Sequence, residues 1–139
     1  MRIFVNVINN KEALVREDVK KKYVSKILSP FLQEKGFVEE YYEEDVDGSS
    51  WVYKRKVEKN RIQVIEIIDK FRYSILRFYI YGERRKYTIS DLDMSHLELV
   101  NEFIKYDNEI EFSSMIVFYK ELIDKKILDY LNKLSATRK

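Results

Sequence analysis

The sequence predicts a single α+β domain over residues 1–139, with a leading amphipathic helix, an antiparallel β-meander of 4–5 strands and two C-terminal helices. Three observations predict this class. Apolar residues recur at helical spacing before Gly36, alternate with polar residues between residues 37 and 89, and return to helical spacing from residue 95 onward. A chain of 139 residues with 45% apolar side chains is large and apolar enough to bury one core.

The leading helix is predicted from about residue 11 to residue 35, because its apolar residues form two neighbouring rows of period four. These rows are Val15, Val19, Tyr23, Ile27 and Phe31, and then Val24, Leu28 and Leu32. The lysines at 20–22 are expected on its solvated face, and Gly36 is expected to end it in the left-handed conformation. Pro30 predicts a kink or break, with Ser29 capping a second short helix. Residues 2–8, "RIFVNVI", are predicted as either a strand or a first helical turn.

The meander is predicted from runs of alternating residues that are separated by turn signals. The runs are "FVEEYYEEDV" from residue 37, "WVYKRKV" from 51, "IQVIEIID" from 62, "YSILRFYIY" from 73 and the short "KYTI" from 86. The run from 62 is apolar on both faces, so we expect it in the middle of the sheet. In the run from 73, Leu76, Phe78 and Ile80 are assigned to the core and the tyrosines to the other face.

Two helices are predicted to close the chain. Ser95 and Glu98 match a capping box, and the helix that follows is expected to carry Leu97, Val100, Phe103 and Ile104 inward until "DNE" at residues 107–109 ends it. The last helix is predicted from about residue 114 to residue 134, with an apolar side made of Phe118, Leu122, Ile127, Leu131 and Leu134.

Composition and motifs argue against several classes of function. There is no cysteine, His96 is the only histidine, and the three glycines are isolated, so thiolate sites, histidine metal pairs and Gly-rich phosphate loops are missing from the sequence. The acidic residues near His96, namely Asp91, Asp93, Glu98 and Glu102, are interpreted as carboxylates at a helix start. We therefore predict no enzyme, no cofactor and no metal, and leave open a paired-carboxylate site that only the fold would assemble. No apolar run is long enough for a bilayer or a signal peptide, which predicts a cytoplasmic protein.

The first hairpin arm is the predicted partner-binding surface, because carboxylates beside aromatic rings suit a basic protein partner. Its residues are Glu39, Glu40, Tyr41, Tyr42, Glu43, Glu44, Asp45 and Trp51. The alternative interpretation is structural. In it, the returning arm "KRK" at 54–56 neutralises the acidic arm, and Trp51 lies in the core.

A nucleic-acid surface is the second hypothesis, because aromatic rings and cations are interleaved around the fourth strand. Its residues are Arg77, Tyr79, Tyr81, Arg84, Arg85 and Lys86. The net charge of +2, from 26 basic and 24 acidic residues, does not favour it. The glycine of "RFYIYGER" also follows the rings, whereas the aromatic strand of RNA-recognition domains has it before them. Tyrosines covering a half-exposed sheet face explain the pattern without a ligand.

The segments "ILSPFLQEKGFVEE" and "WVYKRKVEKNRIQVIEI" resemble a family of small uncharacterised bacterial proteins with a helix, a "KGF" cap and an antiparallel meander. The resemblance covers about residues 20 to 82. Some relatives of this family look like immunity proteins encoded beside secreted toxins. The resemblance implies a bacterial, non-enzymatic protein that binds and neutralises a toxin domain, although the balanced charge departs from the acidic immunity proteins that face nucleases.

Overall fold

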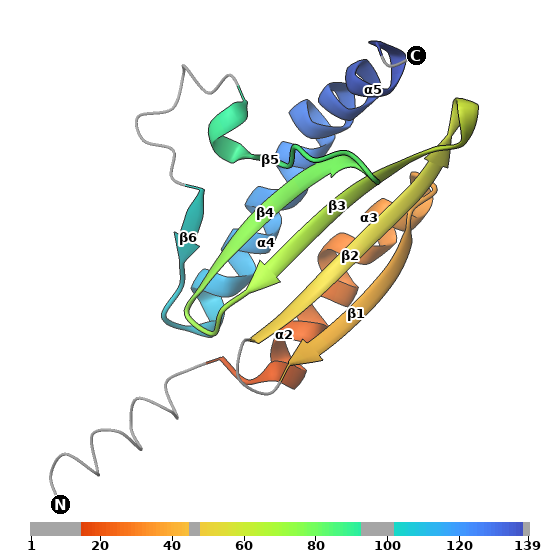
Figure 1. Cartoon of the computed structure of the whole chain (residues 1–139). Helices are drawn as coiled ribbons and strands as arrows, with labels where there is room; N and C mark the ends of the chain where they lie inside the picture. Colours follow the sequence, from red (N-terminus) through yellow and green to blue (C-terminus); the bar gives the residue numbers. More distant parts are fainter. Residues whose placement is uncertain (1–14, 45–47, 93–101, 138–139) are drawn as a thin grey trace, which may run out of the picture.

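The computed structural model describes residues 15–44, 48–92 and 102–137, and it has the predicted α+β class. One antiparallel sheet has the order β1-β2-β3-β4-β5, and β6 pairs with β4 beside β5. The α-helices of the described residues lie on one face of this sheet (Figure 1). The strands are β1 (Val38–Glu44), β2 (Gly48–Val57), β3 (Arg61–Asp69), β4 (Tyr73–Ile80), β5 (Tyr87–Thr88) and β6 (Phe103–Lys105). Residues 2–8 and the predicted capping box at Ser95 and Glu98 lie outside the described residues.

The leading helix continues past Pro30 instead of breaking there. It consists of α2 (Glu17–Tyr23), the π-helical turn η1 (Val24–Leu28) and α3 (Ser29–Glu34). The N–H of Ser29 donates to the carbonyl of Val24, five residues earlier, so the wider turn accommodates the proline without a break. Ser29 does not cap α3, because its hydroxyl donates to the Glu39 carboxylate and lies 3.0 Å from the Tyr53 hydroxyl.

Gly36 ends this helix as predicted. It has φ +96°, and its N–H donates to the carbonyl of Gln33 at 3.0 Å. The N–H of Phe37 donates to the carbonyl of Leu32, also at 3.0 Å. These two bonds form the Schellman arrangement that closes a helix with a left-handed residue. They turn the chain directly into β1 at the edge of the sheet.

The core lies between the helices and the inner face of the sheet. β3 is central, and its inward residues pair across the sheet as Trp51 with Ile67 and Ile65 with Phe78. The prediction for β4 is confirmed, because Leu76, Phe78 and Ile80 are buried in this core. Their alternation with exposed residues follows from the pleat of the strand.

The C-terminal helices α4 (Glu109–Leu122) and α5 (Leu128–Thr137) join through a second π-helical turn, η4 (Ile123–Ile127), into one rod. Asn108 caps α4 by accepting from the N–H of Glu111 at 2.8 Å, so helix begins before the predicted residue 114. The predicted inward helix through Phe103 and Ile104 is wrong at these residues, which form β6. Pairing with Tyr73–Ile75 turns the Phe103 ring to the face without helices, where it is 47% exposed. Within the described ranges, no helix is both long enough and apolar enough to cross a bilayer.

Candidate functional site

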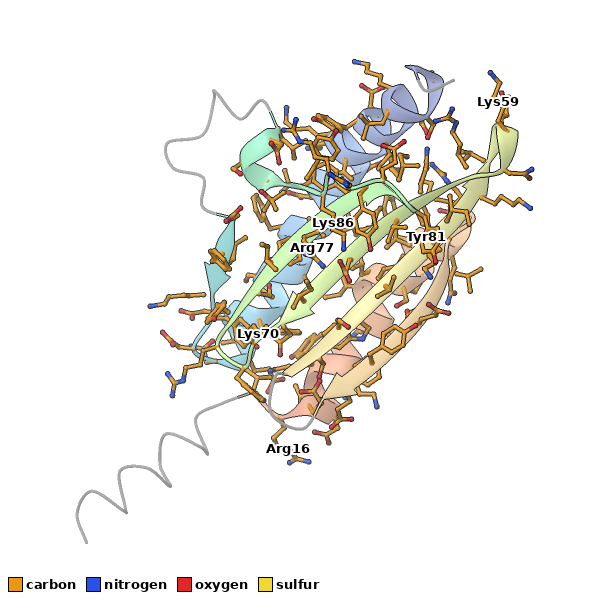
Figure 2. All side chains as sticks on the ribbon, in the orientation of Figure 1. Arg16, Lys59, Lys70, Arg77, Tyr81 and Lys86 are labelled. Carbon is orange, nitrogen blue, oxygen red and sulfur yellow. The ribbon has the colours of Figure 1, made fainter. Side chains whose placement is uncertain are left out.

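No α-helix of the described residues covers the second face of the sheet, and we call this face the outer face (Figure 1). The pleat and the strand register place alternate residues of each strand on it. Arg77, Tyr81 and Lys86 lie over this face in Figure 2. Its side chains come from β1 (Val38, Glu40 and Tyr42), β2 (Ser50, Val52, Lys54 and Lys56), β3 (Ile62, Val64, Glu66 and Ile68), β4 (Tyr73, Ile75, Arg77 and Tyr79), the following residues Tyr81 and Lys86, β5 (Thr88) and β6 (Phe103 and Lys105).

At the centre of the outer face, the apolar Val64 is buried under neighbouring side chains, and the Glu66–Arg77 ion pair lies beside it. Val64 is 0% exposed, and its cross-strand neighbours are Lys54 and Tyr79. The Lys54 ammonium lies 5.1 Å from the centre of the Tyr81 ring, and the Lys86 ammonium lies 4.7 Å from that of Tyr79. Lysine and tyrosine side chains in contact in this way cover the apolar residues of the strand beneath them.

Two ion pairs lie on the outer face. The Arg77 guanidinium donates to one carboxylate oxygen of Glu66 through Nε at 3.0 Å and Nη2 at 2.7 Å. The Lys54 ammonium lies 3.6 Å from the Glu40 carboxylate, which also accepts from the Tyr42 hydroxyl at 2.9 Å. The face also carries Lys56, Lys86 and Lys105, so its cations outnumber its carboxylates.

Exposed apolar side chains gather on the outer face. Five of the eight large apolar side chains that are exposed in the described part of the chain lie there, namely Val38, Tyr42, Tyr73, Tyr81 and Phe103. Tyr73 and Phe103 meet edge to face with ring centres 5.7 Å apart. Aromatic side chains of this kind are enriched at protein interfaces, where they supply buried area at small entropic cost.

The structure divides the predicted acidic arm between the two faces of β1. Glu40 and Tyr42 are on the outer face, whereas Glu39 and Tyr41 point toward the helices. The Tyr41 hydroxyl donates to the Glu17 carboxylate at 2.8 Å, and burial together with that carboxylate raises the pKa of Tyr41 to about 12. Glu43 is exposed and Glu44 ends β1, while Asp45 lies outside the described residues.

Trp51 does not belong to the predicted partner-binding surface. It is 2% exposed, and its ring lies against that of Tyr41 with centres 5.2 Å apart inside the core. The alternative interpretation of the hairpin expected this position for Trp51. It also expected neutralisation across the arms, which the contact between Lys54 and Glu40 supplies at one point.

The predicted nucleic-acid residues are only partly brought together. Arg77, Tyr79, Tyr81 and Lys86 share the outer face, but Glu66 holds the guanidinium of Arg77. The Arg85 guanidinium turns to the Asp91 carboxylate at 3.1 Å and to the ring of Tyr87, which belongs to the core. Arg84 is exposed in the turn.

A buried polar cluster formed by Lys20, Asp69 and Tyr106 corrects the prediction that Lys20 is solvated. The Lys20 ammonium lies 2.7 Å from the Asp69 carboxylate, and the two side chains are 1% and 0% exposed. The Tyr106 hydroxyl donates to the second carboxylate oxygen of Asp69. The sequence spacing could have predicted that Lys20 is buried. Lys20 lies four residues before Val24 and so extends the buried row of Val24, Leu28 and Leu32.

This cluster holds the fold together at the end of the sheet. The Asp69 carboxylate also accepts from the backbone N–H of Phe71 at 3.4 Å, in the turn between β3 and β4. Lys20 is on α2 and Tyr106 precedes α4, so one carboxylate joins three parts of the chain. In the described residues, every buried side-chain nitrogen or oxygen has a hydrogen-bond partner. The cluster is thus a satisfied structural network.

A groove of about 530 Å³ lies between the tip of the β2–β3 hairpin and α5. It is lined by Val57, Glu58, Lys59, Gln63, Asn132, Ser135 and Ala136. The Gln63 amide nitrogen donates to Asn132 Oδ1 at 2.9 Å and to Ser135 Oγ at 3.1 Å, and its oxygen accepts from Arg55. The central amide of the groove is therefore fully used in fastening α5 to the sheet. Residues 15–44, 48–92 and 102–137 contain no group of three histidine, aspartate or glutamate side chains that could hold a metal ion.

Comparison of the chain with protein families, with curated proteins and with solved structures finds no match. The resemblance to a family of small uncharacterised bacterial proteins therefore rests on the two sequence segments that carry it. The outer face is the candidate functional site because of its geometry: exposed aromatic side chains lie at its margins, and the buried Val64 and the Glu66–Arg77 ion pair lie at its centre.

Proposed function

We propose that this protein is a non-enzymatic, cytoplasmic protein-binding module that contacts its partner through the outer face. The observation that carries the proposal is the concentration of exposed apolar side chains on that face. Sheet faces that remain apolar without a covering layer are typical of interaction surfaces. The outer face extends over β1, β2, β3, β4 and β6.

The small net charge of the chain, +2, and the engagement of Arg77 by Glu66 favour a protein over a nucleic acid as the partner. Nucleic-acid affinity comes mainly from cations that contact phosphates and release counterions. On the outer face, Glu66 engages Arg77, and Glu40 lies beside Lys54. Such paired charges supply specificity to a protein interface, because a partner must match them.

The resemblance to immunity-like relatives supports a toxin domain as the partner. Immunity proteins act by covering a surface of the toxin, which needs binding area and no chemistry. The outer face supplies that area with Tyr42, Tyr73, Tyr81 and Phe103 as exposed rings. Aromatic residues of this kind are the usual energetic centres of interfaces.

Affinity capture with matched variants tests the proposal. The test variant is Tyr42→Ser/Tyr81→Ser on the outer face, and the control is Ile110→Ser/Val117→Ser, which removes two exposed apolar side chains from α4. Lysate from the source cells is treated with nuclease before capture. We expect a stoichiometric protein to bind the wild type and the control but not the test variant. Equal retention by both variants, or retention that nuclease abolishes, contradicts the proposal.

A further inference from the structure

We propose that the free edge of β1 binds an extended, lysine- or arginine-rich segment of the partner as an added antiparallel strand. This inference rests on the proposed function and specifies the chemistry of the partner. β1 pairs with β2 along its whole length, and in the described part of the chain no strand lies on its other edge. The helices lie behind the sheet, so β1 forms its outer border (Figure 1).

The backbone of β1 supplies the affinity in this arrangement. An edge strand presents a row of N–H and C=O groups that an extended segment can pair with. β1 has seven residues, Val38–Glu44, and so offers a row long enough for an added strand. It contains neither proline nor glycine. Either residue would weaken the hydrogen-bond ladder with an added strand.

The charge of β1 selects a basic segment. Its sequence "VEEYYEE" has glutamate at 39, 40, 43 and 44 and no basic residue. Glu43 is exposed, and it enters no ion pair in the region that the structure describes. The Glu40 side chain is 47% exposed, with the Lys54 ammonium 3.6 Å away. Opposite charges directly across a strand pair are stabilising.

The same charges disfavour a second copy of this chain as the occupant. Two β1 strands paired antiparallel about Tyr41 would place Glu39 of each copy opposite Glu43 of the other. Like charges directly opposite each other destabilise a strand pair. A basic segment meets the same edge with attraction at each of these positions.

The side chains of β1 also define the pattern of the segment. Val38, Glu40 and Tyr42 lie on the outer face. Glu39, Tyr41 and Glu43 are on the side of the helices. A complementary strand therefore has apolar residues opposite Val38 and Tyr42 and basic residues opposite Glu39, Glu40 and Glu43.

A synthetic peptide tests this edge directly. The probe is a capped seven-residue peptide with valine opposite Val38 and Tyr42, lysine opposite Glu39, Glu40 and Glu43, and threonine elsewhere. Its first control has glutamate in place of each lysine. Its second control keeps the lysines but carries a methyl group on every backbone nitrogen, which removes the donors of the ladder and preserves the charge.

Amide chemical shifts of the full chain report where the peptide binds. We expect the lysine peptide to shift the amides of β1 and to bind at least about tenfold more tightly than the glutamate peptide. The N-methylated peptide should lose this binding. Glu40→Lys/Glu43→Lys should weaken the lysine peptide by about tenfold or more, whereas Glu121→Lys/Asp124→Lys, which changes net charge equally on the C-terminal helices, should not.

Several results would overturn the inference. The edge is not used if the lysine peptide fails to bind, if it binds equally after N-methylation, or if the shifted amides lie away from β1. The glutamates then only protect the edge from pairing. Partner capture that depends on Tyr42 and Tyr81, together with an inactive lysine peptide, would leave the proposed function intact and reject the edge inference alone.

Discussion

The buried ion pair between Lys20 and Asp69 predicts a large loss of stability when the lysine is replaced. Lys20→Met keeps the apolar stem and removes the ammonium that lies 2.7 Å from the Asp69 carboxylate. Both side chains are inaccessible to solvent, so the remaining carboxylate stays buried without its cation. Breaking a buried pair on one side costs about 3–5 kcal/mol.

Contacts that survive the substitution place the expected cost toward the lower end of that range. The Asp69 carboxylate keeps the hydroxyl of Tyr106 and the backbone N–H of Phe71. We therefore expect a loss of about 3 kcal/mol, which is a large share of the 5–15 kcal/mol that stabilises a typical domain. Urea unfolding followed by circular dichroism measures it directly.

Two matched variants make the measurement decisive. Lys133→Met removes an exposed lysine whose ammonium lies 3.1 Å from the Asp129 carboxylate, and it should cost under about 1 kcal/mol. Lys20→Met/Asp69→Asn removes both buried charges and keeps an acceptor for Tyr106, so it should be more stable than Lys20→Met alone. A Lys20→Met variant no less stable than Lys133→Met would refute the role assigned to this pair.

Two further predictions concern tyrosine ionisation and the start of β2. Burial raises the pKa of Tyr41 from about 10 to about 12, so the stability that its neutral phenol contributes is present below pH about 10 and is lost as the pH rises through about 12. Urea unfolding between pH 9 and pH 12 should show this decline, and a smaller decline in Tyr41→Phe; a flat profile would contradict it. Gly48→Ala should cost about 2–4 kcal/mol, because Gly48 has φ +95° and an added Cβ would lie 1.9 Å from the carbonyl oxygen of Asp69. Gly82→Ala, at φ +87° with open space around it, should cost only about 1 kcal/mol, and equal costs by thermal unfolding would disprove the steric argument.

Local patterns in the sequence predicted the parts of the fold that depend on near neighbours. Gly36 follows the last turn of a helix, and this position requires the left-handed conformation that it adopts. The alternation through Leu76, Phe78 and Ile80 identified the buried face of β4 because the pleat has a fixed period. The fold class followed from these local periods.

Residues 103–105 show where local pattern is not enough. Phe103 and Ile104 fit an inward helical stripe in the sequence, yet they form β6 because the edge of β4 beyond β5 offers strand partners at Tyr73–Ile75. That edge is a product of the tertiary fold. A pairing between residues about thirty apart leaves no local signal.

The candidate site was predicted in part for the same reason. The separation of Arg77, Tyr79 and Tyr81 from the core side of β4 followed from alternation. The partner of Arg77 did not, because Glu66 reaches it only through the register of β3 and β4. Trp51 was assigned to the acidic surface from its neighbours in sequence, but its place on β2 turns it inward.

Hydroxyl-radical footprinting of the protein with and without its captured partner locates the binding surface. Side-chain oxidation is read by mass spectrometry at the exposed apolar residues of both faces. If the partner binds the outer face, Tyr42, Tyr81 and Phe103 become less reactive to hydroxyl radicals in the complex. Ile110 and Val117 on α4 keep their reactivity. Protection of Ile110 and Val117 with unchanged oxidation of the three outer-face rings would contradict binding through the outer face.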